Sequence, residues 1–104
     1  MLFLQVDIME EFRKLTYKYP NLVSVARMMM QASEKFNIPL FMIEDNKKAM
    51  GKTAKEILEV KHKYVQQFEK FVFSVYEDPK IRSAIYNLHP NHVIIYASYS
   101  LLWT

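Results

Sequence analysis

The sequence predicts an α/β domain with a mainly parallel sheet, and three observations carry this prediction. Short apolar runs alternate along the chain with helical patterns, as they do in βαβ proteins. The runs are almost continuously apolar, which is typical of strands that are buried on both faces. A length of 104 residues and a hydrophobic content of 51% suit a globular protein, so residues 1–104 are expected to form a single domain.

Four apolar segments are expected to be strands. They are residues 2–6, 39–43, 71–73 and 92–96. The first ends at Asp7 and the second at Glu44, while the fourth contains three β-branched residues in succession, which favour strands. Residues 64–68 are weakly patterned and are assigned to no element.

Three segments are expected to be helices. The longest follows Pro20 and ends at Asn37, a residue type that tolerates the left-handed conformation at a helix end. Its buried face is expected to comprise Leu22, Val25, Ala26, Met29 and Phe36. A short second helix begins at Thr53, because Thr53 and Glu56 have the spacing of a capping box. The third begins at Asp78, an N-cap residue type followed by proline.

The composition excludes several kinds of site. The chain has no cysteine, and therefore no thiol nucleophile, disulfide or cysteine zinc site. Its single glycine excludes glycine-rich phosphate loops. The three histidines, His62, His89 and His92, lie in or beside predicted loops without metal-ligand spacing. We therefore expect surface histidines, no metal and no cofactor.

The charge and hydropathy patterns predict the kinds of partner and the cellular compartment. The net charge is only +3, and the aromatic residues are not interleaved with arginines, so nucleic-acid binding is not expected. No apolar run reaches the roughly 18 residues of a membrane span, and the first residues lack the pattern of a signal peptide. A cytoplasmic protein without a membrane partner is expected.

A polar set at the ends of the predicted strands suggests a site. Asp7 and Glu44 each follow a strand, and Lys70 stands at the start of the third. In open α/β sheets, functional sites lie at the carboxyl ends of the strands, and two acids with a lysine there favour acid–base chemistry. An acid after a strand is, however, more often a helix cap or a loop residue, and spacing alone leaves both interpretations open.

Several segments, in order along the chain, carry a resemblance to a known family. They are Val6–Phe12, Pro20–Ala26, Ile38–Leu40, Glu44 with Met50–Thr53, Lys70–Ser74 and Leu88–Tyr96. Together they resemble the isochorismatase-like family of cysteine hydrolases, and in particular the eukaryotic isochorismatase domain-containing proteins. The resemblance covers nearly all of this chain but about the amino-terminal half of a family domain. An incomplete domain, truncated after the fourth strand, is therefore expected.

The resemblance implies a three-layer α/β/α, Rossmann-like fold and a catalytic set of Asp, Lys and Cys. Asp7 matches the aspartate that takes the thiol proton, and Lys70 matches the lysine that holds a positive charge near the nucleophile. The cysteine attacks a carbonyl carbon in amide-hydrolysing members. Its place falls at or next to Trp103, where this chain has no cysteine.

Departures from the family pattern shape the functional hypotheses. Met9 replaces a glutamine and Ala97 replaces a glycine, while Ser98 and Ser100 are candidate substitute nucleophiles that do not fall at the cysteine's place. The first hypothesis is a catalytically inactive isochorismatase-like domain. The second is an active hydrolase with a substitute nucleophile or a completing chain. The third is a non-catalytic homo-oligomer that pairs through the edge of the fourth strand and the Leu101–Trp103 tail. The substrate is not predicted.

Overall fold

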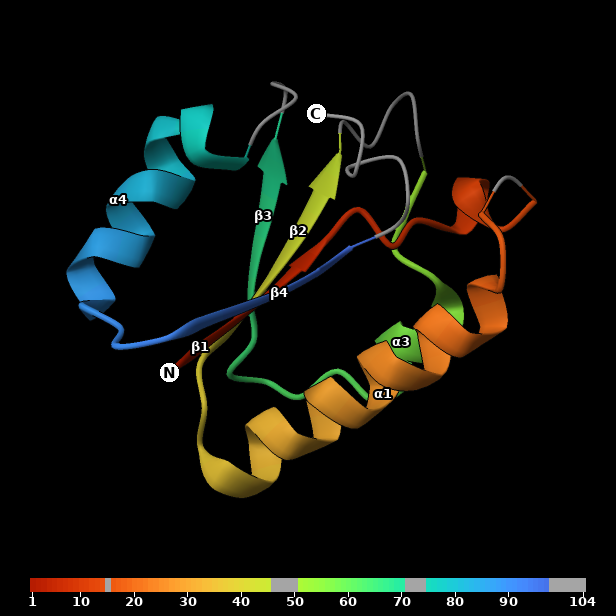
Figure 1. Cartoon of the computed structure of the whole chain (residues 1–104), viewed down its shortest axis with the longest axis horizontal. Coiled ribbons are helices and arrows are strands. Elements are labelled where there is room, and N and C mark those ends of the chain that lie inside the picture. The colour runs from red at the N-terminus through yellow and green to blue at the C-terminus, as the bar shows by residue number, and fades with distance from the viewer. Residues whose placement is uncertain (15, 46–50, 71–74, 98–104) are drawn as a thin grey trace.

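The computed structural model describes residues 1–14, 16–45, 51–70 and 75–97. In these residues four parallel strands form one sheet in the order β3-β2-β1-β4, which confirms the predicted α/β fold (Figure 1). The strands are β1 (Leu2–Val6), β2 (Leu40–Asp45), β3 (Gln66–Lys70) and β4 (Val93–Ala97). The helices are α1 (Tyr19–Phe36), α3 (Lys55–Leu58) and α4 (Pro79–Leu88), with short 3-10 helices η1 (Glu10–Phe12) and η2 (Val75–Glu77).

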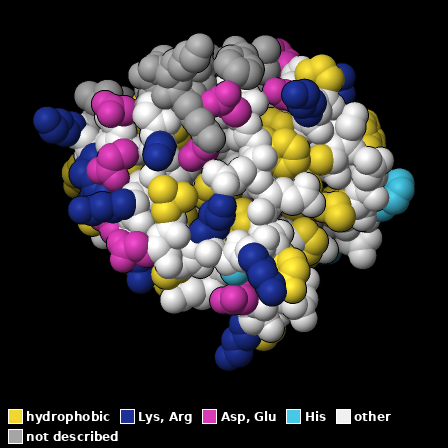
Figure 2. Space-filling model, turned by 180° about the vertical axis from the view of Figure 1, so that it is seen from behind, with side chains coloured by type: hydrophobic (Ala, Val, Ile, Leu, Met, Phe, Trp, Pro, Cys, Tyr) yellow, Lys and Arg dark blue, Asp and Glu magenta, His cyan; other side chains and the backbone are white. Residues whose placement is uncertain are grey.

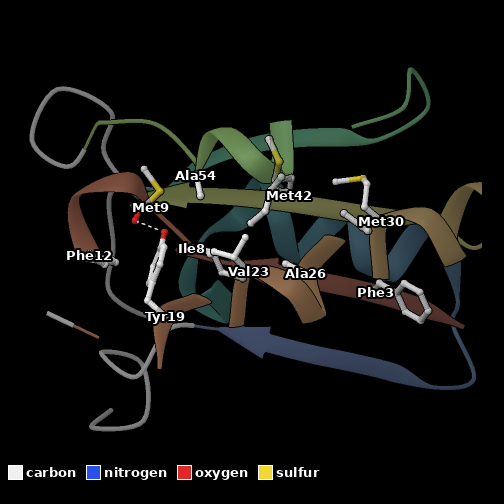
Figure 3. Packing of buried hydrophobic residues seen from close by; sticks show 12 residues of the cluster. Phe3, Ile8, Met9, Phe12, Tyr19, Val23, Ala26, Met30, Met42 and Ala54 are labelled. Atoms are coloured by element: carbon white, nitrogen blue, oxygen red, sulfur yellow. Dashed lines mark hydrogen bonds between the residues drawn. The ribbon is translucent and has the colours of Figure 1, made fainter. Parts of the chain in front are cut away.

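Helices cover both faces of the sheet, so the fold has three layers. The helices α1 and α3 lie on one face and α4 lies on the other (Figure 1). Successive side chains of a strand point to opposite faces, so β1 and β2 supply two hydrophobic clusters. The cluster under α1 and α3 includes Phe3, Leu40 and Met42 (Figure 3). The cluster under α4 comprises Leu2, Leu4, Val6, Phe41, Ile43 and Ile81.

The third strand differs from the sequence prediction. Residues 71–73, which were expected to form it, lie outside the described residues, and β3 instead begins at Gln66 in a segment that the pattern left unassigned. β3 lies at an edge of the sheet, where its first residues are exposed, so it needs no continuous apolar run. Phe68 anchors it by packing on Phe41, with ring centroids 5.0 Å apart.

The buried face of α1 is also shifted from the prediction. It comprises Tyr19, Val23, Ala26, Met30 and Ser33. Val25 and Phe36 were expected to be buried but are 45% and 64% exposed. The helix begins at Tyr19, earlier than expected, and the Tyr19 hydroxyl donates to the Met9 carbonyl oxygen at 2.6 Å (Figure 3). This hydrogen bond holds Tyr19 on the buried face at the start of the helix. Its end at Asn37, in the left-handed conformation, is confirmed.

The two shorter helices begin differently. Asp78 is the expected N-cap of α4, and its Oδ1 accepts from the backbone N–H groups of Lys80 and Ile81. The capping box predicted at Thr53 is wrong, because α3 begins after Ala54 without a side-chain cap and Thr53 bonds to Glu44 instead. Among the described residues, no helix is long and apolar enough to cross a membrane.

Candidate functional site

Asp7 marks the point where the chain leaves the carboxyl end of β1. Its backbone N–H donates to the Ile43 carbonyl oxygen at 2.9 Å, which continues the sheet by one residue. Its φ of 55° is left-handed, a conformation that aspartate tolerates better than most residues. The side chain is thereby turned away from the strand direction and lies almost fully buried, with the residue 2% exposed.

Lys70 is the last residue of β3, whereas the sequence placed it at the start of a strand. The difference matters because the last residue of a parallel strand lies at the same edge as Asp7. Neighbouring strands are about 4.8 Å apart, and β2 separates β1 from β3, so a long side chain is needed to bridge them. Lys70 Nζ lies 2.9 Å from Asp7 Oδ2, with side chains 2% and 3% exposed.

The electrostatics of this pair are set by burial. Desolvation is the largest influence and raises the pKa of Asp7 above its ordinary value. The hydrogen bond and the charge of Lys70 oppose this rise, while the charge of Asp45 adds to it. Asp7 Oδ1 is covered and has no hydrogen-bond partner among the described residues. Lys70 thus holds the Asp7 carboxylate through Oδ2, and a backbone hydrogen bond at Asp45 also opposes the rise in pKa.

Glu44 fixes a neighbouring loop. It lies within β2, not after it, and its Oε2 accepts from the backbone N–H and the hydroxyl of Thr53, at 3.0 and 2.7 Å. Thr53 also forms an isolated bridge with Met9, two residues after Asp7. Glu44 therefore ties β2 to the backbone that follows Asp7, which is a structural role.

An ionic network that the sequence did not reveal lies next to the segment that follows Asp7. Arg13 bridges Glu10 and Glu56, with nitrogen–oxygen distances of 2.6 Å to each. Its guanidinium also lies over the Tyr19 ring, 5.0 Å from the centroid. The available signal was the three-residue spacing of Glu10 and Arg13, which suits a helical turn. The network links η1 to α3 and so supports the segment after Asp7.

The remaining predicted site residues fall into two groups. Ser98, Ser100, Trp103 and the Leu101–Trp103 tail lie outside the described residues. Among the histidines, His89 and His92 are exposed, and His62 is half-buried and bonds to Ser33. Within the described part of the chain, no three His, Asp or Glu side chains are grouped as metal ligands.

Figure 2 shows one face of the molecule, where cationic and acidic side chains are interspersed on one side and hydrophobic side chains gather on the other. At the sheet, β4 pairs with β1 in a register that places Ala97 opposite Val6. β4 therefore ends beside the residue that precedes Asp7.

Comparisons with known proteins agree with the fold. No family model matches the chain. Isochorismatase domain-containing protein 2 from Xenopus laevis is 40% identical over 51 residues, which are 49% of this chain and 25% of that protein. A structure described as the MAR1 ribonuclease of Caenorhabditis elegans superimposes with a TM-score of 0.82 at 20% identity, covering 98% of this chain and 57% of its own.

Two further structures share the fold at lower identity. A protein described as an isochorismatase family protein has a TM-score of 0.77 at 8% identity, over 92% of this chain and 62% of its own. An octameric hydrolase of unknown specificity from Escherichia coli has a TM-score of 0.76 at 16% identity, over 92% of this chain and 48% of its own. The chain thus spans a quarter of the matched relative and about half of these structures.

The chain shares its three-layer fold with these structures, one of which is described as an isochorismatase family protein, so its fold is isochorismatase-like. In sequence it resembles isochorismatase domain-containing protein 2 over 51 residues.

Proposed function

We propose that Asp7 and Lys70 are the proton acceptor and the charge-stabilising lysine of an isochorismatase-like hydrolase site. The observation that carries the proposal is the contact of 2.9 Å between two side chains that are almost fully buried at the carboxyl edge of the sheet. We further propose that these 104 residues do not hydrolyse substrates through a thiol by themselves, because they contain no cysteine.

The properties of Asp7 suit a proton acceptor. A carboxylate is a more effective base near neutral pH when its pKa is raised, and burial raises the pKa of Asp7. Lys70 holds Oδ2, which leaves Oδ1 for an incoming proton. When Asp7 accepts that proton, its partner Lys70 retains a positive charge that stabilises the anion left behind.

The course of the backbone supports a nucleophile at the place that the family pattern gives. Ala97 ends β4 opposite Val6, the residue before Asp7, so β4 ends beside the proposed site. A thiol that the family pattern brings next to the buried Lys70 would have a lowered pKa and a raised reactivity.

The test is to introduce a thiol by Trp103→Cys, which is then the sole cysteine in the chain. At pH 7 its alkylation by iodoacetamide is expected to be about tenfold faster than that of a thiol introduced by Met28→Cys, because the lysine lowers its pKa. Met28 is 66% exposed on α1 and is the matched control. Adding Lys70→Met should remove the advantage, whereas Lys70→Arg should keep part of it.

Equal alkylation rates for the two thiols would overturn the assignment of Asp7 and Lys70. The unchanged chain is expected to show no turnover on amide or vinyl-ether substrates. Turnover would contradict the proposed inactivity and would point to a substitute nucleophile, for which Ser98→Ala and Ser100→Ala are the tests.

A second candidate function is self-association, which we propose because β4 is an exposed edge among the described strands. Val93, Ile94 and Ile95 are 40%, 41% and 63% exposed, an apolar run that charges do not protect. A strand from a second copy would satisfy the unpaired backbone groups of β4 and cover these side chains. One structural neighbour is described as octameric, which is consistent with assembly.

The test of self-association is sedimentation of the chain and of Ile95→Lys. The wild-type chain is expected to sediment as an oligomer and Ile95→Lys as a smaller species, because a lysine on an edge strand opposes strand pairing. Tyr17→Lys, at a residue that is 86% exposed away from the sheet, is the control and should leave the oligomer unchanged. A monomeric wild-type chain would contradict this candidate function.

A further inference from the structure

A cavity lies at the amino ends of the strands, whereas Asp7 and Lys70 lie at their carboxyl ends. What the cavity binds is therefore independent of the function proposed above. It is a cavity of about 330 Å³, near the lower end of the range for small-ligand sites. It is formed where α1 and α4 end and where β2 and β3 begin. Its lining includes Ser33, Glu34, Ile38, His62, Tyr64 and Leu88.

The wall of this cavity is held in place by hydrogen bonds. Ser33 is 1% exposed, and its hydroxyl donates to the Ile38 carbonyl oxygen at 2.6 Å. The Ile38 backbone N–H donates to the Ser33 carbonyl oxygen at 3.0 Å, which closes the end of α1. Because the Ser33 hydroxyl has a single hydrogen, His62 Nε2, 3.0 Å away, must be the donor to Ser33 Oγ. Ser33 is thus a structural anchor for the His62 ring.

The side chains around the cavity offer acceptors to a ligand. With Nε2 protonated, His62 Nδ1 carries a lone pair, and it has no hydrogen-bond partner among the described residues. Glu34 adds a carboxylate, and no lysine or arginine belongs to the lining that the structure describes. The Tyr64 ring adds an aromatic surface to the lining, with Lys63 Nζ 5.2 Å from its centroid.

The same cavity has an apolar part. Ile38, Pro39 and Leu88 line it and supply aliphatic surface. A carboxylate, an imidazole lone pair and an aromatic face beside aliphatic surface together match a molecule with a cationic donor and an apolar body. We propose that this cavity binds a small organic ammonium compound, with its ammonium group at Glu34 and its apolar body against Ile38 and Leu88.

The arrangement also predicts how the ligand engages His62. Nδ1 is covered in this structure, and the Tyr64 side chain beside it is 76% exposed, with the two ring centroids 6.4 Å apart. We expect a ligand N–H group to approach Nδ1 from the cavity, which His62 lines. It then satisfies an acceptor that is otherwise unmatched, which favours binding.

The test is a binding titration of the whole chain with phenethylamine, phenethyl alcohol and phenylacetate, which differ in charge but share a body. Saturation-transfer NMR observes the ligand and therefore works whether or not the chain self-associates. Phenethylamine is expected to bind with a dissociation constant on the order of 1 mM, as suits a ligand of so few atoms, and to shift the imidazole resonances of His62. The alcohol should bind more weakly and phenylacetate weakest.

Two substitutions test whether the carboxylate of Glu34 binds the ammonium group. Glu34→Gln should weaken phenethylamine binding about threefold and leave the alcohol unaffected, because an exposed ion pair contributes little more than that. Glu59→Gln, at an exposed acid outside the lining, is the matched control and should change neither. Phenylacetate binding as tightly as the amine, equal effects of the two variants, or no saturation transfer from the amine would overturn the proposal.

Discussion

Lys70→Met tests the buried pair most sharply, because methionine keeps much of the side-chain length and removes the charge. The substitution leaves Asp7 as a carboxylate that is 2% exposed, without the ammonium group 2.9 Å from its Oδ2. Removing one partner of a buried ion pair typically costs about 3–5 kcal/mol. Small domains have about 5–15 kcal/mol of stability in total, so this loss is expected to be a large fraction of it.

The loss should depend on pH in a defined direction. Burial raises the pKa of Asp7 in the folded chain above its ordinary value, so the folded chain binds that proton more tightly than the unfolded chain. The contribution of Asp7 to stability therefore improves as pH falls through the raised pKa and is lost as pH rises above it. Lys70→Met removes the opposing influence of the lysine and raises this pKa further. The variant should be least destabilised in acid and most destabilised at neutral pH and above.

Urea unfolding followed by circular dichroism at several pH values measures both effects. The double variant Asp7→Asn/Lys70→Met carries neither charge and is expected to recover most of the loss at neutral pH, since replacing a whole buried pair is often close to neutral. A loss that does not change with pH would refute the reasoning. So would a double variant whose destabilisation equals the sum of the two single variants.

Two further substitutions test features near the site and in the second layer. Gly51→Ala should destabilise the chain by about 1 kcal/mol or more, because φ of Gly51 is +78° and the new Cβ would lie 3.3 Å from Glu11 Cγ. Thermal unfolding measures this loss, and an unchanged melting temperature would contradict it. Asp78→Ala should lower the free energy of unfolding by about 1 kcal/mol, because the backbone N–H groups of Lys80 and Ile81 lose their acceptor. Asp78→Ser should retain most of the stability, and equal losses in the two variants would count against a capping role.

Much of the fold was predictable because burial leaves a direct pattern in the sequence. β1 and the first four residues of β2 are buried throughout, which is why they read as almost continuous apolar runs. The missed strand, β3, lies at an edge where only Lys70 is fully buried, so its polar side chains gave no strand pattern. The face of α1 was misjudged because the pattern left out Tyr19, which is buried and donates a hydrogen bond to the Met9 carbonyl oxygen.

The candidate site was predictable in its residues but not in its contacts. Resemblance to a family identified Asp7 and Lys70, yet the contact between them depends on the strand order and on where β3 ends. Glu44 was grouped with them because it lies near the end of an apolar run, and only its hydrogen bonds to Thr53 separate it. Sequence spacing carries no information about which of several polar side chains meet across a sheet.

The most direct test of the central claim is a carboxyl NMR titration of Asp7 in the wild-type chain and in Lys70→Met. The account predicts that the pKa of Asp7 lies above its ordinary value in the wild type, because the side chain is buried, and that Lys70→Met raises this pKa further by removing the ammonium group. An Asp7 that titrates at or below its ordinary value, or whose pKa does not respond to the loss of Lys70, would contradict the buried acid–lysine pair.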